Sequence, residues 1–213
     1  MNAFELAEAE IGSRDSAYPF ADIVSKINSM DTTWKAEIPK RFIDHTEEEM
    51  TGVINCSKKD PNFKNLPIAP KIEMDLFIPD AFDSRTNWPN CSKTIGLIRD
   101  QSNCGSCWAF GAAEAMSDRI CIKSMAATIV NISAEDINDC CRTCGEGCNG
   151  GYPLAAWMFY KNDGVVTGGN CMSKSGCKPY SLKSCDHHIP NSPNPCPEKI
   201  ARTPRCQKMC MSG

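Results

Sequence analysis

The cysteine content of this chain limits what it can fold into more than any other feature of its sequence. Fifteen of its 213 residues are cysteine, and since Cys56 alone precedes residue 78, fourteen (15 − 1) fall in residues 78–213. Such a density, about one residue in ten, is typical of domains that disulfides hold together in an oxidising compartment. Because fifteen is odd, at least one thiol cannot pair within a single chain. We therefore expect a disulfide-bonded body with one cysteine kept for another use.

Charge divides the chain at the same place. Residues 1–77 hold 14 acidic and 9 basic side chains (−5), and residues 78–213 hold 12 and 14 (+2), which together give the net charge of −3. So small a net charge argues against a nucleic-acid partner, and no apolar run reaches the roughly 18 residues of a membrane-spanning helix. A proline-rich stretch, 66–70, connects the two parts. We interpret them as a pro-segment, 1–77, and a mature domain, 78–213; an ordinary N-terminal subdomain is the alternative.

Four stretches have the pattern of helices. Apolar residues fall at helical spacing over 20–27, and small residues line one face of 108–122, which predicts a deeply buried helix. A start similar to a capping box at Ser133 predicts a short helix that ends near Cys140. Pro153 begins a further helix that stops at Gly164. Beyond it we expect only a brief strand at 165–166, followed by loops.

The segment 101–110 places one cysteine at the start of the buried helix. Cys107 lies in the first turn, where unpaired N–H groups and a partial positive charge favour thiolate over thiol and so lower the pKa of a cysteine. A thiolate there is a nucleophile, and the Cys107 N–H together with the Gln101 side-chain amide can stabilise an oxyanion. From this position alone, an ordinary half-cystine is the alternative.

The residues around Cys107 resemble those of papain-like thiol proteases. Cys-Gly-Ser-Cys-Trp at 104–108 is a local signature of that family, and blocks at 78–85, 118–121 and 148–153 follow in the family's order. The doublet Cys140-Cys141 and the loop from Cys185 through His187 and His188 to Cys196 are similar to the cathepsin B group in particular. The resemblance covers nearly all of 78–213 and, more weakly, 32–36.

This resemblance implies an α+β, papain-like fold, of which the chain would hold mainly the helical domain with an occluding loop, preceded by a pro-segment and lacking the C-terminal barrel. Cys107 would be the nucleophile and Gln101 the oxyanion donor. The residues implied to contact substrate are Gly150, Gly151, Tyr152, Pro153, His187 and His188. In the family the paired histidines bind the C-terminal carboxylate of the substrate, which implies peptidyl-dipeptidase as well as endopeptidase activity. Asp100 would pair with His187, so loop closure should depend on pH.

Two positions depart from the family pattern: Ser102 stands where glycine is usual, and Pro193 where an arginine makes a second clasp on the loop. The resemblance also implies six disulfides, namely Cys91–Cys121, Cys104–Cys148, Cys140–Cys206, Cys141–Cys144, Cys177–Cys210 and Cys185–Cys196. It leaves Cys107 free and does not assign Cys56 or Cys171. No metal or other cofactor is expected. Cys140, Cys141, Cys144 and Cys148 are the candidates for a zinc site, but adjacent cysteines suit zinc poorly.

A protease of this kind also needs a histidine as general base and an asparagine to orient it, about 130–150 residues beyond the nucleophile. After Cys107 there are 213 − 107 = 106 residues, and the three histidines are His45, in the pro-segment, and His187 and His188, in the loop. We therefore expect the chain to stop before the second half of the protease and to be inactive alone.

The resemblance implies peptide or protein substrates, the pro-segment as an intramolecular inhibitor, and cystatin-like inhibitors as partners. Because the disulfides need an oxidising compartment, we expect a lysosomal or extracellular location. Two alternatives belong to other functional classes. One is a catalytically dead binding or decoy module that uses half of a cleft, and the other is a protease inhibitor built from residues 1–77.

Overall fold

A computed structural model of the chain describes residues 21–38, 64, 79–187, 189, 191–197 and 199–211. The chain forms two compact units, Met1–Thr51 and Gly52–Gly213. The division falls before the expected boundary at 77/78, and the pro-segment therefore stays a prediction. None of the described helices is both long enough and apolar enough to span a membrane.

The described part of the first unit contains helix α2, Ala21–Ser29, where the helical spacing of apolar residues predicted one. The chain after it folds back on the helix end through the side chain of Asn28. Its amide donates to the carbonyl of Ala36 (2.9 Å) and its oxygen accepts the Ala36 N–H (2.8 Å). Lys35 adds a third hydrogen bond, from its Nζ to the Asn28 carbonyl (3.0 Å).

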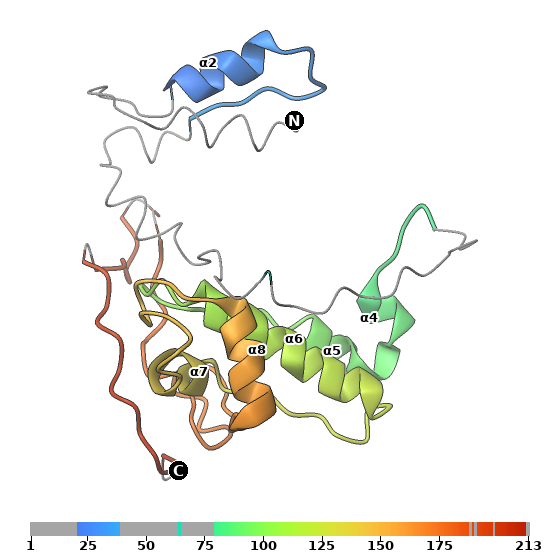
Figure 1. Cartoon of the computed structure of the whole chain (residues 1–213), viewed down its shortest axis with the longest axis vertical. Coiled ribbons are helices and arrows are strands. Elements are labelled where there is room, and N and C mark those ends of the chain that lie inside the picture. The colour runs from blue at the N-terminus through green and yellow to red at the C-terminus, as the bar shows by residue number, and fades with distance from the viewer. Residues whose placement is uncertain are drawn as a thin grey trace. The chain divides into compact units, whose positions relative to one another are not determined.

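The second unit is built around helix α6, Cys107–Lys123, with α7 and α8 packed against it (Figure 1). One face of α6 is buried because its side chains are small or apolar: Ala109, Ala112 and Ala113 are at most 3% exposed. This face belongs to a core that also includes Trp108, Phe110, Met116, Ile137, Ala156 and Tyr180. The deeply buried helix predicted over 108–122 is thus confirmed.

Helices α7, Ala134–Cys140, and α8, Pro153–Asn162, begin at the residues that the sequence predicted. The Ser133 hydroxyl accepts the N–H of Asp136 (3.0 Å) and donates to the carbonyl of Lys178 (2.7 Å), so this cap also joins α7 to a distant loop. Pro153 occupies the first turn of α8, where its missing N–H costs nothing.

The strand expected at 165–166 is wrong. The Val166 N–H, which a neighbouring strand would have to bind, donates instead to the carboxylate of Asp136 (3.2 Å). Pairing moves two residues along the chain, to isolated bridges between Ile132 and Thr167 and between Gly168 and Gly176. In the described residues, β-structure consists of such isolated bridges.

Three short helices before α6 have no counterpart among the sequence predictions: α4, Ser84–Asn87, the 3-10 helix η3, Pro89–Cys91, and α5, Ser92–Ile95. Asp83 caps α4 by accepting the N–H of Arg85 (2.8 Å). An exposed ion pair between the same residues (2.7 Å) lowers the pKa of Asp83 to about 2. The disulfide Cys91–Cys121 fastens these helices to the last turns of α6.

Six disulfides are present in the described residues, and their pairing is the one that the resemblance implied. Four of them close loops of 30 to 66 residues, whose ends the folded chain must bring together. A disulfide stabilises mainly by restricting the unfolded chain, typically by about 2–4 kcal/mol each. This crosslinking compensates for a helical core that consists of three helices and long irregular segments.

Candidate active site

Cys107 is the first residue of α6 and is partly exposed. The residue before it, Ser106, is fully buried, and its hydroxyl lies 3.0 Å from the hydroxyl of Tyr180 instead of capping the helix. Helix α6 is 17 residues long and has no acidic side chain in its first turn. The positive end of its dipole therefore acts on Cys107 without a neighbouring carboxylate from the same turn.

The expectation that Cys107 is free is wrong for this structure. Cys107 is disulfide-bonded, and its partner lies outside the described residues. Among the described cysteines, Cys171 is the free one. A helix N-terminus stabilises the thiolate that reduction would release, so we expect the oxidised state of Cys107 to be readily reduced. In this state the sulfur cannot attack a peptide, so reduction must precede any catalysis.

Gln101 lies six residues before Cys107, and its main chain and side chain are both bound. Its side-chain nitrogen donates to the carbonyl of Cys104 (2.7 Å), and its own carbonyl accepts the Tyr180 hydroxyl (2.9 Å). A primary amide has two N–H groups. One fixes the side chain against its own loop and the second is the group that could meet an oxyanion.

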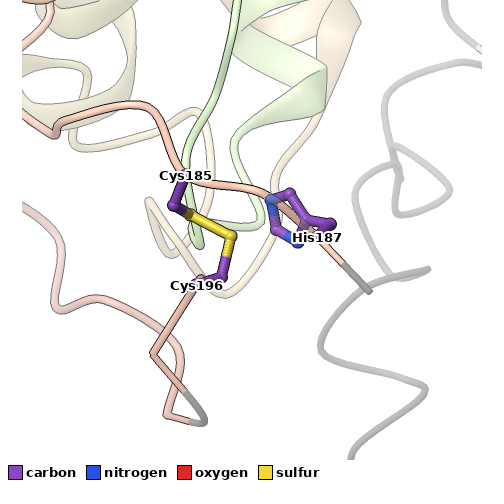
Figure 2. Close-up of side chains that lie close together, drawn as sticks. All are labelled: Cys185, His187 and Cys196. Carbon is purple, nitrogen blue, oxygen red and sulfur yellow. A yellow bond between two sulfur atoms is a disulfide. The ribbon is translucent and has the colours of Figure 1, made fainter. Parts of the chain in front are cut away.

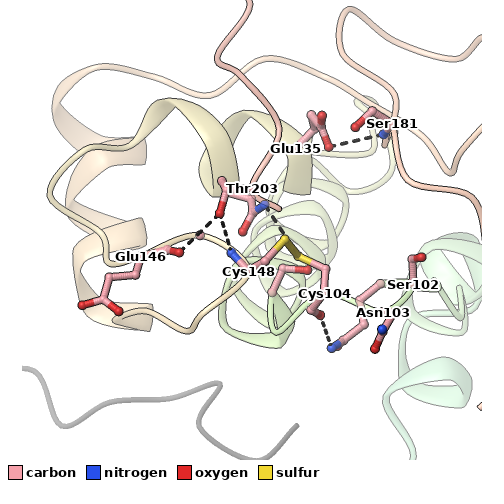
Figure 3. Close-up of a disulfide and its surroundings, with 12 residues drawn as sticks. Ser102, Asn103, Cys104, Glu135, Glu146, Cys148, Ser181 and Thr203 are labelled. Carbon is pink, nitrogen blue, oxygen red and sulfur yellow. Dashed lines mark hydrogen bonds between the residues drawn. A yellow bond between two sulfur atoms is a disulfide. The ribbon is translucent and has the colours of Figure 1, made fainter. Parts of the chain in front are cut away.

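The disulfide Cys104–Cys148 joins this loop to the glycine-rich segment 147–151 (Figure 3). Next to it, the Gly105 N–H donates to the Cys148 carbonyl (2.8 Å), and Gly105 pairs with Asn149 in a parallel bridge. Thr203 supports the same segment, because its hydroxyl accepts the Cys148 N–H (2.9 Å) and donates to the Glu146 carbonyl (3.3 Å). The loop that carries Cys107 and the predicted substrate-binding glycines are thus fixed to one another.

Gly151 is close to Trp108, the residue that follows Cys107. A Cβ added at Gly151 would lie 2.5 Å from the indole ring and 2.6 Å from the carbonyl of Cys144. The indole N–H of Trp108 donates to the Gly147 carbonyl (3.0 Å). The absence of a side chain at Gly151 is therefore needed for packing, independently of any substrate. Gly150 has a φ of 99°, which also favours glycine.

Tyr152 and Pro153 follow directly, as the N-cap and first residue of α8. The Tyr152 N–H donates to the Cys144 carbonyl (2.7 Å), which fixes the start of the helix, and both side chains are partly exposed. Their predicted role in lining substrate pockets stays a prediction.

His187 lies next to the disulfide Cys185–Cys196 at the base of the predicted occluding loop (Figure 2). Its Nε2 is 3.2 Å from the carbonyl oxygen of Ser102. Ligand atoms of Cys185, His187 and Cys196 lie within 4.8 Å of one another, as do those of Asp139, Cys140 and Cys206. Each group contains a disulfide, and oxidised sulfurs are not thiolate ligands. His188 lies outside the described residues.

Asp100 and His187, the predicted clasp, bind the same residue from two sides. The Asp100 carboxylate accepts the Ser102 N–H (2.6 Å), while His187 lies at the Ser102 carbonyl. Ser102 itself is buried and has a φ of 57°, in the left-handed region that favours glycine. The departure from the family pattern at this position therefore carries a backbone cost. A direct Asp100–His187 pair stays a prediction.

Replacing Ser102 by glycine is expected to raise the free energy of unfolding by about 0.5–1 kcal/mol. The left-handed conformation costs an L-residue about 1–2 kcal/mol, and glycine avoids this cost. Part of the gain is lost because glycine has more conformational entropy in the unfolded chain. Chemical denaturation with the disulfides intact measures the change. Ala115→Gly, inside α6, is the control and should lower stability by about 1 kcal/mol. A loss of stability in Ser102→Gly would show that the buried hydroxyl outweighs the strain.

Tyr180 is a site residue that the sequence did not indicate. It is 2% exposed, its ring packs edge-on against Phe110, and its hydroxyl binds both Gln101 and Ser106. Burial raises the pKa of this phenol above its usual value, so it remains a neutral donor. Tyr180 therefore supports the segment 101–106 from a position 73 residues beyond Cys107, and no local motif marks it.

The structure thus places Gln101 and the glycine pair 150–151 in segments fixed to the loop that leads into α6, where Cys107 lies, and their roles in catalysis stay predictions. Residues 78–210 match the family described as papain family cysteine protease, and the chain belongs to this family. The solved structure of procathepsin B S9 from Trypanosoma congolense agrees with the fold, with a TM-score of 0.63 and 30% identity over 89% of this chain and 58% of that one. The papain-like fold is thereby confirmed.

Within the family, the similar curated proteins are cathepsin B-like. Cathepsin B-like cysteine proteinase 6 of Caenorhabditis elegans is 43% identical over 208 residues, 95% of this chain and 55% of the relative. Cathepsin B-like cysteine proteinase of Schistosoma japonicum is 40% identical over 219 residues, 100% of this chain and 63% of the relative. The chain thus spans between 55% and 63% of the length of these relatives.

Proposed function

We propose that this chain carries the nucleophile-bearing part of a cathepsin B-like peptidase that cleaves peptides internally and also removes dipeptides. The observation that supports this most directly is the position of Cys107, at the start of α6 and in a loop that the disulfide Cys104–Cys148 fixes to Gly150 and Gly151. Edge-to-edge pairing of a substrate with this glycine segment would present its carbonyl to the nucleophile.

In the proposed reaction, the Cys107 sulfur forms a bond to the carbonyl carbon of the substrate, and the carbonyl oxygen becomes an oxyanion. The N–H of Cys107 and the second N–H of the Gln101 amide hold that charge. Collapse of the intermediate breaks the C–N bond, and the leaving amine takes a proton from an imidazolium. The imidazole then takes a proton from water as that water attacks the thioester, and cleavage of the carbon–sulfur bond releases the acid and restores the thiolate and the imidazolium.

Of the groups that this reaction needs, the imidazole of the general base has the weakest support among these 213 residues. His187 is placed at the Ser102 carbonyl in the loop, and His45 and His188 are the other two histidines. We infer that a polypeptide limited to these residues does not turn over peptides, since no histidine is supported as the general base of Cys107. His187 and His188 would instead bind the terminal carboxylate of a substrate during dipeptide removal.

We also infer that the protein is made as a zymogen in an oxidising, lysosomal or extracellular compartment. The support is chemical: disulfides form in such a compartment, and Cys107 is itself oxidised here. Residues 1–77 would act as the intramolecular inhibitor, and cystatin-like proteins as separate inhibitors. Reduction of Cys107 is then a step of activation.

Selective alkylation of Cys107 tests the proposal without requiring turnover. After mild reduction that leaves the six described disulfides intact, iodoacetamide at about pH 5 should label Cys107 at least about tenfold faster than Cys171, because only a stabilised thiolate reacts at that pH. Peptide mapping by mass spectrometry measures both rates. Cys171→Ser should leave the labelling unchanged and Cys107→Ser should abolish it. Equal rates at the two sulfurs would contradict an activated nucleophile.

A further inference from the structure

The loop closed by Cys185–Cys196 is fastened at its start to Ser102. The Ser102 carbonyl lies 3.2 Å from His187 Nε2, and the Ser102 hydroxyl lies 3.9 Å from the sulfur of Cys185. Inside the loop, Asp186 and Asn194 bridge its two arms, because the Asp186 N–H donates to the Asn194 carbonyl (2.8 Å). These contacts hold the start of the loop, at Cys185 to His187, against Ser102.

The residues that follow the loop are fastened to the next residue in sequence, Asn103. The Asn103 side-chain nitrogen donates to the carbonyls of Pro197 (2.6 Å) and Lys199 (2.8 Å), and its main-chain carbonyl accepts the N–H of Ala201 (2.7 Å). Three hydrogen bonds thus join a single residue to the segment 197–201. Asparagine suits this position because its amide has two N–H groups, and both are used.

Asn103 itself stands on a rigid base. It precedes Cys104, which is 3% exposed and bonded to Cys148, and the chain reaches Cys107 three residues further on. A segment bound to Asn103 therefore keeps a fixed position relative to the nucleophile. Pro193 stands at the position where the resemblance places a loop arginine that makes a second clasp, so the arginine of that clasp is missing here.

We propose that Asn103 is a positioning residue that holds the end of the 185–196 loop against the nucleophile segment and so favours removal of dipeptides over internal cleavage. This role rests on the proposed peptidase function. Asn103 does not need to touch the substrate for this role. Its effect passes through the loop, which must stay in place to bind the carboxylate of the substrate.

Asn103→Asp tests the structural half of this proposal on the chain as it stands. Aspartate has the same shape but offers no N–H, and it places negative charge beside two carbonyl oxygens. Hydrogen–deuterium exchange of the amides of Asp186, Cys196 and Ala201 should become at least about tenfold faster, since two hydrogen bonds are lost. Asn162→Asp, at the end of α8, is the matched control and should leave these amides unchanged.

Asn103→Ser, which keeps one donor, should give an intermediate increase, and amides within α6 should exchange at the original rate in every variant. That pattern separates local loosening from a failure to fold. Unchanged exchange of the three loop amides in Asn103→Asp would overturn the proposal, whether or not the protein proves to be a peptidase.

The proposed effect of Asn103 on specificity is measured in protein that hydrolyses peptides. Asn103→Asp should lower kcat/KM for dipeptide removal about fivefold to tenfold, while kcat/KM for an internally cleaved substrate blocked at its C-terminus stays the same or rises. If both fall together, Asn103 acts on the nucleophile loop and the specificity role is wrong. If no form of the protein cleaves peptides, the proposed function fails, and the exchange measurement still decides the structural role of Asn103.

Discussion

Replacing Lys178 by methionine is expected to lower the free energy of unfolding by about 3–5 kcal/mol, because it leaves a buried carboxylate without its partner. Lys178 is 4% exposed and Asp136 is 6% exposed, and the Lys178 Nζ lies 2.5 Å from Asp136 Oδ1. The same ammonium lies 3.1 Å from the sulfur of Cys140. Methionine fills similar volume, so the loss comes from the unpaired charge and not from a cavity.

A double-mutant cycle with Asp136→Asn separates the pair from its surroundings. The asparagine side chain is neutral, so the combination of Asp136→Asn with Lys178→Met should cost at least about 1–2 kcal/mol less than the sum of the single losses. Guanidinium unfolding at about pH 7 with the disulfides intact measures all three variants. Lys183→Met, at an exposed lysine of the same segment, is the control and should change stability by less than about 0.5 kcal/mol. A loss below about 1 kcal/mol in Lys178→Met would show that water reaches the pair.

The helices that local signals mark could be predicted from the sequence. Ser133 caps α7 through its hydroxyl, Pro153 fills the first turn of α8, and the alanines of α6 face the core, all of which follow from spacing along the chain. Helix α4 carries a similar signal in Asp83, which the sequence interpretation did not use. The strand at 165–166 could not be corrected from the sequence, because the acceptor that takes its N–H is Asp136, 30 residues away.

The site divides in the same way. Cys107 and Gln101 lie six residues apart and form a motif, whereas Tyr180, Asn103 and Thr203 support the site through contacts that span 55 to 98 residues. Asn103 even lies inside the motif, but its partners at 197–201 cannot be read from it. The oxidised state of Cys107 is also beyond local reasoning, because the motif at 101–110 does not show which second cysteine the folded chain brings to it.

Asp139 lies next to the Lys178–Asp136 pair, in the last turn of α7, and is placed unfavourably for a carboxylate. Burial raises its pKa to about 7, and the nearby carboxylates of Glu135 and Asp136 act in the same direction, while Lys178 opposes them. Among the described residues its Oδ1 has no hydrogen-bond partner. The negative end of the helix dipole adds to the cost of its charge. Asp139 therefore binds a proton more tightly in the folded protein than in the unfolded chain.

Stability should consequently fall as the pH rises from about 4 to about 7, because over this range the folded state retains a proton that the unfolded state has lost. Three pH units at about 1.4 kcal/mol each would give about 4 kcal/mol, and partial exposure to solvent reduces the expected loss to about 2 kcal/mol. Asp139→Asn mimics the protonated form. It should match the original protein at about pH 4 and exceed its stability by about 2 kcal/mol at about pH 8, which guanidinium unfolding at both pH values measures. Asp163→Asn, at the exposed end of α8, is the control and should leave the pH slope unchanged. An equal slope in Asp139→Asn would place the titrating proton on another carboxyl, and burial also raises the pKa values of Glu114, Asp118 and Glu135.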